Sequence, residues 1–143
     1  MSRTADIDFS FHDPVAISNV LHALVENGVS FQHQGEVSYV LDLNGMFEWI
    51  QVPENELSRV TAEADGAHAR SSIFAISAYF TEQNTGGEFM FHKDRKEVSF
   101  MATINRRHVF ESSKFCDFGW YLDRLVPALE PLGLSELVAR DYK

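Results

Sequence analysis

The residue types that could do chemistry are scattered along this 143-residue sequence, and no familiar catalytic or metal-binding motif joins them. The six histidines stand apart from one another, at His12, His22, His33, His68, His92 and His108. The sequence contains no HExxH motif and no cysteine–histidine pair at zinc spacing. We therefore expect no metal centre.

Two local groups of residues could in principle bind a metal or react. His22 and Glu26 are four residues apart in a predicted helix, so both could reach one metal ion, but such pairs are common neighbours on helix surfaces. Cys116 precedes Asp117 near a predicted helix start, where the pKa of a thiol can be lowered. Free cysteines are usually buried, however, and we interpret Cys116 as a core residue.

Other catalytic signatures are missing from the sequence. It has no G-x-S-x-G motif, no glycine-rich phosphate loop and no S-x-x-K motif. Acidic residues are plentiful, but no two are marked out as an acid–base pair, and Gly86-Gly87 is interpreted as a turn. We predict that the chain is not an enzyme, has no catalytic residues and uses no cofactor.

The formal net charge of −9 lies entirely in the first half of the chain. Residues 1–67 hold two basic residues against eleven acidic ones. The basic clusters at 93–96 and 106–107 are too short for a nucleic-acid surface, and we interpret each as a solvated turn. The acidic half could attract a basic protein, or could simply keep the chain soluble.

The expected setting is the cytoplasm, without nucleic-acid or membrane partners. No apolar run approaches the roughly 20 residues that a membrane helix needs. The N-terminus lacks the pattern of a signal peptide, and a single cysteine cannot form an intramolecular disulfide. We predict one domain over residues 1–143, in which 1–12 form a loose arm, although Ile7, Phe9 and Phe11 alternate and could add a short strand.

A first helix is predicted over residues 14–27. Asp13 is suited to cap it, Pro14 to occupy its first position, and Gly28 to end it. A short strand follows over 29–33, and a turn at Gln34-Gly35.

Asn44-Gly45 between two alternating segments predicts a hairpin with a two-residue type I′ turn. Its core-side pairs would be Leu43–Met46, Leu41–Glu48, Tyr39–Ile50 and Val37–Val52. The reverse face would place Val40 opposite Trp49, with Phe47 diagonal to Val40.

A second hairpin is predicted around Asp94-Arg95. With a two-residue loop, Phe91 faces Val98 and Phe89 faces Phe100, which builds a continuous apolar face. Met90 and Met101 fall on the reverse face.

Four other segments complete the prediction, and two of them are ambiguous. Residues 57–64 fit a helix or a strand, and we favour a strand; residues 71–84 fit both equally. Asp117 is suited to cap a helix that Pro127 must kink or end, and Ser135 to cap a last short helix over SELVARDY.

The central run AISAYFTEQN, TGG, EFMFHKD and KEVSFMATIN resembles the YbjN-like proteins and the class I type III secretion chaperones. The resemblance spans roughly residues 14–130 and implies that 71–84 form a helix. The implied fold is α+β, an antiparallel sheet packed with helices in the order α-βββ(β)-α-ββ-α. The family further implies a non-catalytic protein, often a homodimer, that binds an extended segment of another protein, such as a secreted effector.

These patterns suggest two surfaces. Apolar residues on the reverse faces of the hairpins are predicted to bind a protein partner, unless helices cover both faces: Val40, Phe47, Trp49, Met90 and Met101. A helix over 71–84 would carry apolar residues on more than one side, so Phe74, Ala75 and Ala78 are predicted to form a dimer interface. The alternative function is a small acidic immunity protein that neutralises a basic toxin domain.

Overall fold

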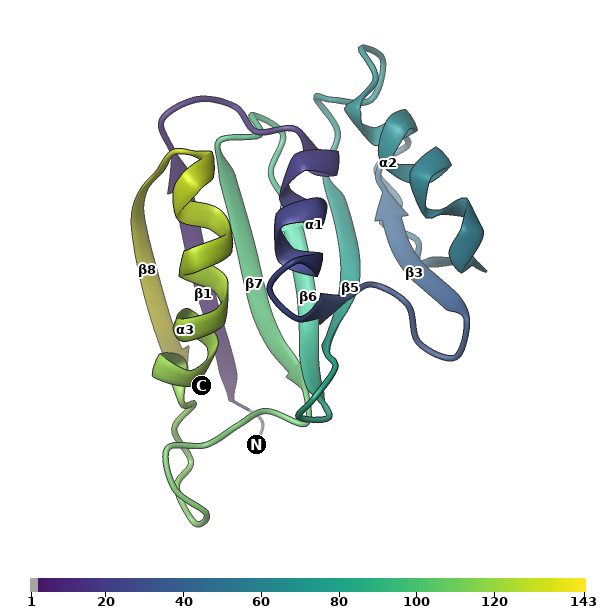
Figure 1. Cartoon of the computed structure of the whole chain (residues 1–143). Coiled ribbons are helices and arrows are strands. Elements are labelled where there is room, and N and C mark those ends of the chain that lie inside the picture. The colour runs from purple at the N-terminus through teal and green to yellow at the C-terminus, as the bar shows by residue number, and fades with distance from the viewer. Residues whose placement is uncertain (1–2) are drawn as a thin grey trace.

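The computed structural model describes residues 3–143 and has an α+β architecture, with three α-helices against one antiparallel eight-stranded sheet (Figure 1). Two short 3-10 turns, Glu54–Glu56 and Glu130–Leu132, adjoin α2 and α3. In chain order the elements are β1 (Thr4–Phe11), α1 (Ile17–Val25), β2 (Val29–Ser30), β3 (Glu36–Leu41), β4 (Ile50–Pro53), α2 (Leu57–Asp65), β5 (Phe74–Phe80), β6 (Thr85–Phe91), β7 (Glu97–Ile104), α3 (Phe118–Leu129) and β8 (Leu134–Tyr142).

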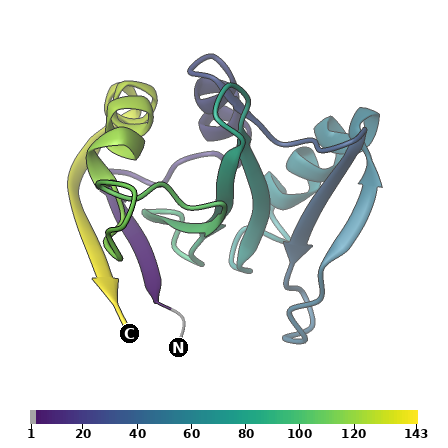
Figure 2. The same ribbon diagram turned by 90° about the horizontal axis from the view of Figure 1, so that it is seen from below.

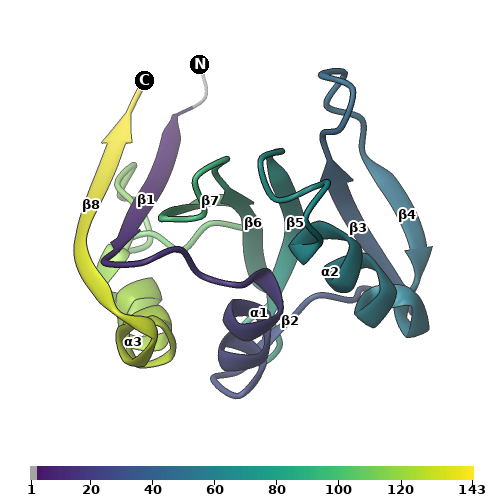
Figure 3. The same ribbon diagram turned by 90° about the horizontal axis from the view of Figure 1, so that it is seen from above.

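The strands lie in the order β4-β3-β5-β6-β7-β1-β8, and β2 pairs with β5 beside β3. Strands β4 and β8 are therefore the two edges of the sheet. All three helices lie on one side of it (Figures 2 and 3), so within residues 3–143 the other face carries no helix. We name this second side the open face.

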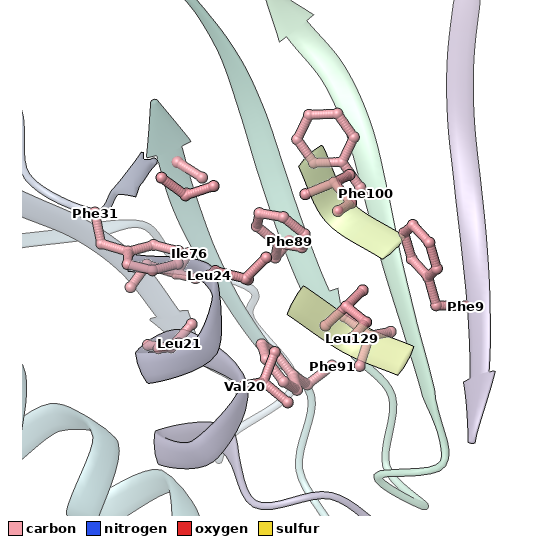
Figure 4. Packing of buried hydrophobic residues seen from close by; sticks show 14 of the residues in the cluster. Phe9, Val20, Leu21, Leu24, Phe31, Ile76, Phe89, Phe91, Phe100 and Leu129 are labelled. Carbon is pink, nitrogen blue, oxygen red and sulfur yellow. The ribbon is translucent and has the colours of Figure 1, made fainter. Parts of the chain in front are cut away.

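The hydrophobic core forms between the helices and the sheet (Figure 4). Phe9, Phe89 and Phe100 come from three strands and are fully or almost fully buried. The rings of Phe89 and Phe100 lie 4.9 Å apart, and Leu24 of α1 and Leu129 of α3 complete the cluster. Alternation along each strand sends these side chains to one face, which is why the helices cover that face.

The second predicted hairpin is confirmed in its register. Phe91 pairs with Val98 and Phe89 with Phe100 across β6 and β7. The interpretation of its turn as solvated is wrong for Arg95, which is 4% exposed. Burial lowers the pKa of the Arg95 guanidinium, while the nearby charges of Asp65 and Asp94 act in the opposite direction.

Gly86 and Gly87 do not form the predicted turn but lie inside β6. A Cβ atom on Gly87 would stand 1.9 Å from the carbonyl oxygen of Met101, and one on Gly86 would stand 2.2 Å from that of Ala78. The two glycines therefore permit a close approach of neighbouring backbones.

The N-terminal segment is not a loose arm. Residues 4–11 form β1, which pairs with β7 on one side and β8 on the other. Ile7, Phe9 and Phe11, the alternating residues of the sequence, are buried on its core face. Pairing with two distant strands is a non-local effect that period-two alternation could only hint at.

Helix α1 begins later than predicted, at Ile17, and the residue before it provides no side-chain cap. The cap comes from Asp65 at the end of α2. Its Oδ1 accepts a hydrogen bond from the N–H of Ile17 at 2.7 Å, and its Oδ2 one from the N–H of Ser18 at 3.1 Å. A carboxylate at the positive end of the helix dipole stabilises α1 and ties it to α2.

The two ambiguous segments have states opposite to those predicted. Residues 57–65 form helix α2, whose Val60 and Ala64, four residues apart, are buried in the core. Residues 74–80 form strand β5, between β6 on one side and β3 with β2 on the other. A central strand offers partners on both edges, and this pairing overrides local helix propensity.

The predicted dimer interface is therefore wrong. Phe74, Ala75 and Ala78 lie on a central strand rather than on a helix, and each is at most 1% exposed within the single chain. Their side chains already pack inside the protein and cannot reach a second copy.

The C-terminal third contains the predicted helix α3, but its last segment is a strand and not the predicted helix. Asp117 caps α3 as predicted, accepting a hydrogen bond from the N–H of Trp120 at 3.2 Å. The helix passes through Pro127 and ends two residues later. SELVARDY is not a helix but part of β8, because β1 presents a free edge that the segment pairs along its length. The expected element order is thus not the observed one.

None of the helices formed by residues 3–143 combines the length and apolar character that crossing a bilayer requires.

The remote cap of α1 gives a stability prediction. Asp65→Ala removes both hydrogen bonds to Ile17 and Ser18, and we expect the free energy of unfolding in urea to fall by about 1–2 kcal/mol. Asp13→Ala is the matched control, since Asp13 is exposed and four residues before α1; it should cost less than about 0.5 kcal/mol. Equal losses in the two variants would contradict the assignment of the cap.

Candidate functional site

The loop between β3 and β4 is wider than the predicted two-residue turn. The predicted pairs Tyr39–Ile50 and Val37–Val52 are confirmed, but β3 ends at Leu41 and β4 begins at Ile50. The loop thus takes up Leu43, Met46 and Glu48, so neither of the two inner pairs predicted for the hairpin forms.

Side-chain hydrogen bonds shape this loop. Asp42 Oδ1 accepts from the N–H of Phe47 at 2.9 Å, and Asn44 Oδ1 from the N–H of Met46 at 3.0 Å. Gly45 has a positive φ but Asn44 does not, so the predicted type I′ turn is wrong. Asp and Asn side chains that bind nearby N–H groups compete with the strand ladder, which accounts for the open loop.

Large apolar side chains gather on this loop and at the start of β4. We name them the apolar tip: Leu43, Met46, Phe47, Trp49 and Ile50. All five are exposed, from 38% for Phe47 to 64% for Met46. The rings of Phe47 and Trp49 meet edge to face, with centroids 6.3 Å apart. In Figure 3 the loop points away from α1 and α3.

The predicted partner-binding residues divide into two groups. Phe47 and Trp49 belong to the exposed tip. Val40 is fully buried, although it lies on the open face, so it offers nothing to a partner and its assignment is wrong. Met90 and Met101 are half-buried on adjacent strands of the open face. Strands β3 and β5 lie between β4, which begins at the tip, and β6, which carries Met90.

The electrostatic surroundings of the tip are strongly acidic. Residues 36–56, which include β3, the loop and β4, contain no Lys or Arg and five acids: Glu36, Asp42, Glu48, Glu54 and Glu56. The segment therefore has a formal charge of 0 − 5 = −5. The charge imbalance noticed in the sequence is concentrated at this end of the sheet.

The other half of the open face holds a polar network. Ser99 Oγ donates a hydrogen bond to Asp8 Oδ1 at 2.6 Å, and His92 Nε2 lies 2.9 Å from the same Oγ and 3.4 Å from Glu97 Oε2. Arg140 forms ion pairs with Asp8 and, at 3.4 Å, with Asp6. The network joins β1, β7, β8 and the turn after β6, and the sequence does not predict it, because Asp6 and Arg140 are 134 residues apart.

Serine, histidine and aspartate do meet here, but in an order unlike that of a hydrolase. The hydroxyl of Ser99 gives its single proton to Asp8, so the hydrogen bond with His92 must be donated by the Nε2–H of the imidazole. An activated serine needs an imidazole nitrogen that accepts the proton from Oγ. The geometry therefore fixes side chains across three strands rather than activating Ser99.

The remaining candidates for chemistry have structural surroundings. His22 Nε2 contacts Glu26 Oε1 at 3.1 Å on the solvent side of α1, as the surface interpretation expected. Across residues 3–143, no three His, Cys, Asp or Glu side chains cluster as a metal site would require. The interpretation of Cys116 as a buried residue is confirmed. Burial raises the pKa of its thiol to about 11, against the opposing effect of Arg106.

Comparison with known protein families, with curated proteins and with solved structures gives no match. The resemblance to YbjN-like proteins and secretion chaperones stays a prediction.

The sequence did not predict a second exposed apolar group, because residues 105–114 are mostly polar. The loop before α3 exposes Val109, Phe110 and Phe115, and the guanidinium of Arg3 lies 4.7 Å from the ring centre of Phe115. The apolar pair Val109-Phe110 between charged residues was the available signal. Unlike the tip, this loop carries basic residues, Arg106, Arg107 and Lys114.

The burial of Cys116 gives a prediction of thiol reactivity. Raising the pKa from 9.0 to about 11 lowers the thiolate fraction about a hundredfold at neutral pH, and the side chain is only 4% exposed. We expect a disulfide reagent at pH 7.5 to modify the native protein at least a hundredfold more slowly than the urea-unfolded chain. Similar rates in the two states would show that Cys116 is accessible and reactive.

Proposed function

We propose that this chain is a non-catalytic protein-binding module whose partner docks on the apolar tip. The observation that carries the proposal is the exposure of five large apolar side chains on one short segment, 43–50. Contiguous exposed apolar surface marks interaction sites, and Trp, Phe and Met are enriched in them. Removal of these side chains from water on binding would provide the driving force.

The conformation of the loop supports a binding role. Phe47 has a φ of +50°, a region that bulky residues rarely adopt and that costs on the order of 1–3 kcal/mol. The hydrogen bond from its N–H to Asp42 holds this conformation. The aromatic side chain gains little burial in return, since it stays 38% exposed. Strain that presents a side chain to solvent is better explained by recognition than by folding.

The edge strand beside the tip favours an extended segment of the partner. The N–H of Glu54 donates a hydrogen bond to the carbonyl of Gly35. Because the direction of main-chain hydrogen bonds alternates along an antiparallel strand, the N–H and C=O groups of Val52 point toward β3. The N–H and C=O groups of Gln51 point outward. Pro53 has no N–H, so the free edge is short. A segment that bonds to Gln51 can lay its apolar side chains across the tip.

Charge favours a basic partner. Asp42 and Glu48 lie in the loop of the tip, and Glu36, Glu54 and Glu56 lie at the other end of the same hairpin, with no basic residue in the segment 36–56. Opposite charge on a partner would speed association and orient it, while the apolar contacts would hold the complex together. We therefore expect the partner to carry Lys or Arg residues next to apolar ones.

The absence of turnover is part of the proposal. The hydrogen bond from Ser99 to Asp8 directs the hydroxyl proton away from His92, which supports a structural role for the serine. Asp8 is also paired with Arg140, so its charge is already balanced.

Two biological settings suit such a module. A regulator or secretion chaperone, as the resemblance implies, would bind an extended segment of another protein. An immunity protein would instead mask the basic surface of a toxin domain, and the acidity around the tip favours this second candidate specifically. Inhibition of a toxin by the captured complex would select the immunity role, and binding without inhibition the chaperone role.

Capture of the partner tests the proposal directly. An affinity-tagged chain is used to isolate bound proteins from the source cell, which are identified by mass spectrometry. Phe47→Ser with Trp49→Ser removes both aromatic side chains of the tip, and we expect the captured amount of a specific partner to fall at least tenfold.

The matched control is Val109→Ser with Phe110→Ser, which removes two exposed apolar side chains from the other loop. It should leave capture unchanged, and both double variants should keep the unfolding midpoint of the wild type. A partner that is retained by the tip variant, or lost equally from both, would refute the docking site.

Salt dependence tests the role of charge once the partner is known. We expect the association rate constant to fall steeply between roughly 0.01 M and 0.15 M salt, as the Debye length shortens from about 30 Å to about 8 Å. Glu48→Gln with Glu54→Gln should flatten that dependence, whereas Glu111→Gln with Glu130→Gln, on the opposite half of the sequence, should not. An association rate that ignores salt would reduce the acidity to a solubility feature.

A further inference from the structure

The outer edge of β8 is the longest free edge of the sheet. The strand covers nine residues and pairs only with β1 in the part of the chain that the structure describes. Figure 3 shows it at the end of the sheet opposite to β4, with no element beyond it. Val138 and Tyr142 on this strand are about half exposed, which is unusual for large apolar side chains. Free edges with apolar residues invite a further strand.

The main-chain groups that point outward from β8 follow from the ladder. The N–H of Phe11 donates to the carbonyl of Lys96, so the odd residues of β1 bond toward β7 and the even residues toward β8. The partners of the even residues, Glu136, Val138 and Arg140, therefore turn inward to β1. The N–H and C=O groups of Leu137 and Ala139 point away from the sheet.

The sequence of β8 is complementary to itself when it is reversed about Val138. Antiparallel pairing with a second copy places Glu136 opposite Arg140, Leu137 opposite Ala139 and Val138 opposite Val138. Val138 of each copy then covers Val138 of the other, which is about half exposed in the single chain. Leu137 and Ala139 form hydrogen-bonded pairs in this register, which matches their outward main-chain groups.

Other registers lose this match. Centring the pairing on Leu137 places Arg140 opposite Leu134, and centring it on Ala139 places Leu137 opposite Asp141. Only the register about Val138 pairs opposite charges, and both charged side chains are accessible: Glu136 is exposed and the side chain of Arg140 is 52% exposed. Charges directly opposite on adjacent strands stabilise the pairing when their signs differ.

We propose that two copies of this chain form a dimer by antiparallel pairing of β8 with β8, about a two-fold axis at Val138. The two sheets then become one continuous sheet, and the copies bury Val138 of each other. The apolar tips lie at the two far ends, so the dimer would present two separate partner surfaces. This interface is distinct from the tip and does not depend on the function proposed for it.

The first test is the mass in solution, by sedimentation or light scattering across a dilution series. We expect twice the chain mass of 16.3 kDa for the wild type. Ala139→Pro deletes an outward N–H and places a proline ring on the free edge, while the bonds from β8 to β1 stay intact. This variant should be a folded monomer by circular dichroism, and Ala139→Ser, which keeps the N–H, should remain a dimer.

The second test addresses register. Glu136→Lys places a positive charge opposite Arg140 at two symmetric positions, and the dissociation constant of the dimer should rise about tenfold at low salt. Glu130→Lys makes the same charge change at an exposed position outside β8 and should leave the constant unchanged. A wild-type chain that is monomeric throughout the series, or an Ala139→Pro chain that still dimerises, would overturn the proposal. Loss of partner capture in the tip variant alone would leave it untouched.

Discussion

The buried guanidinium of Arg95 is the contact on which the arrangement of the helices over the sheet most depends. It donates hydrogen bonds to the carbonyls of Ser72 and His92 at 2.7 and 3.0 Å, and to those of Ala64 and Ala69 at 3.4 and 3.3 Å. One side chain thereby joins the end of α2, the loop that leads into β5, and the turn between β6 and β7. A charged group at this depth is tolerated because carbonyl oxygens and the nearby carboxylate of Asp65 compensate for lost hydration.

Asp65 extends the same connection to α1. Its carboxylate caps that helix while it balances the charge of Arg95, so α1, α2 and the β6–β7 turn are held relative to one another by two side chains. This junction fixes α1 and α2 relative to the turn between β6 and β7. The opposite face of the sheet carries a polar network, and the half-buried Met90 and Met101 lie within it as cross-strand partners of Ser99 and Asp6.

Helices cover a single face of this sheet, so the other face and both edge strands are exposed. The two edge strands differ in length and in sequence. At β4 the edge is short, ends in Pro53, and adjoins an acidic loop with exposed aromatic residues. At β8 the edge is long, and charged residues alternate along it with Val138. A short edge with an apolar tip suits a foreign segment, while a long self-complementary edge suits a second copy. These are separate surfaces on one rigid sheet.

Local sequence determined much of this protein by itself. Alternation set the registers Phe91–Val98 and Tyr39–Ile50, Asp117 set the start of α3, and Phe47 and Trp49 were recognisable as candidates for exposure because they fell on the side away from the core. These features depend on neighbours within a few residues, whose geometry the backbone period fixes.

Only the tertiary structure decided the states of residues 57–65, 74–80 and 134–142, and the strand at 4–11. The first three are short segments whose apolar spacing is compatible with both helix and strand, and 4–11 alternates over only three apolar residues, so the state of each depends on partners far away in the chain. Asp65 as the cap of α1, and the meeting of Asp8, Ser99 and Arg140, belong to the same class, because contacts between residues 48 to 132 positions apart leave no local trace. The sequence predicted the apolar tip in part, through Phe47 and Trp49. The exposure of Leu43, Met46 and Ile50 depends on the open loop, in which side-chain hydrogen bonds replace the expected turn.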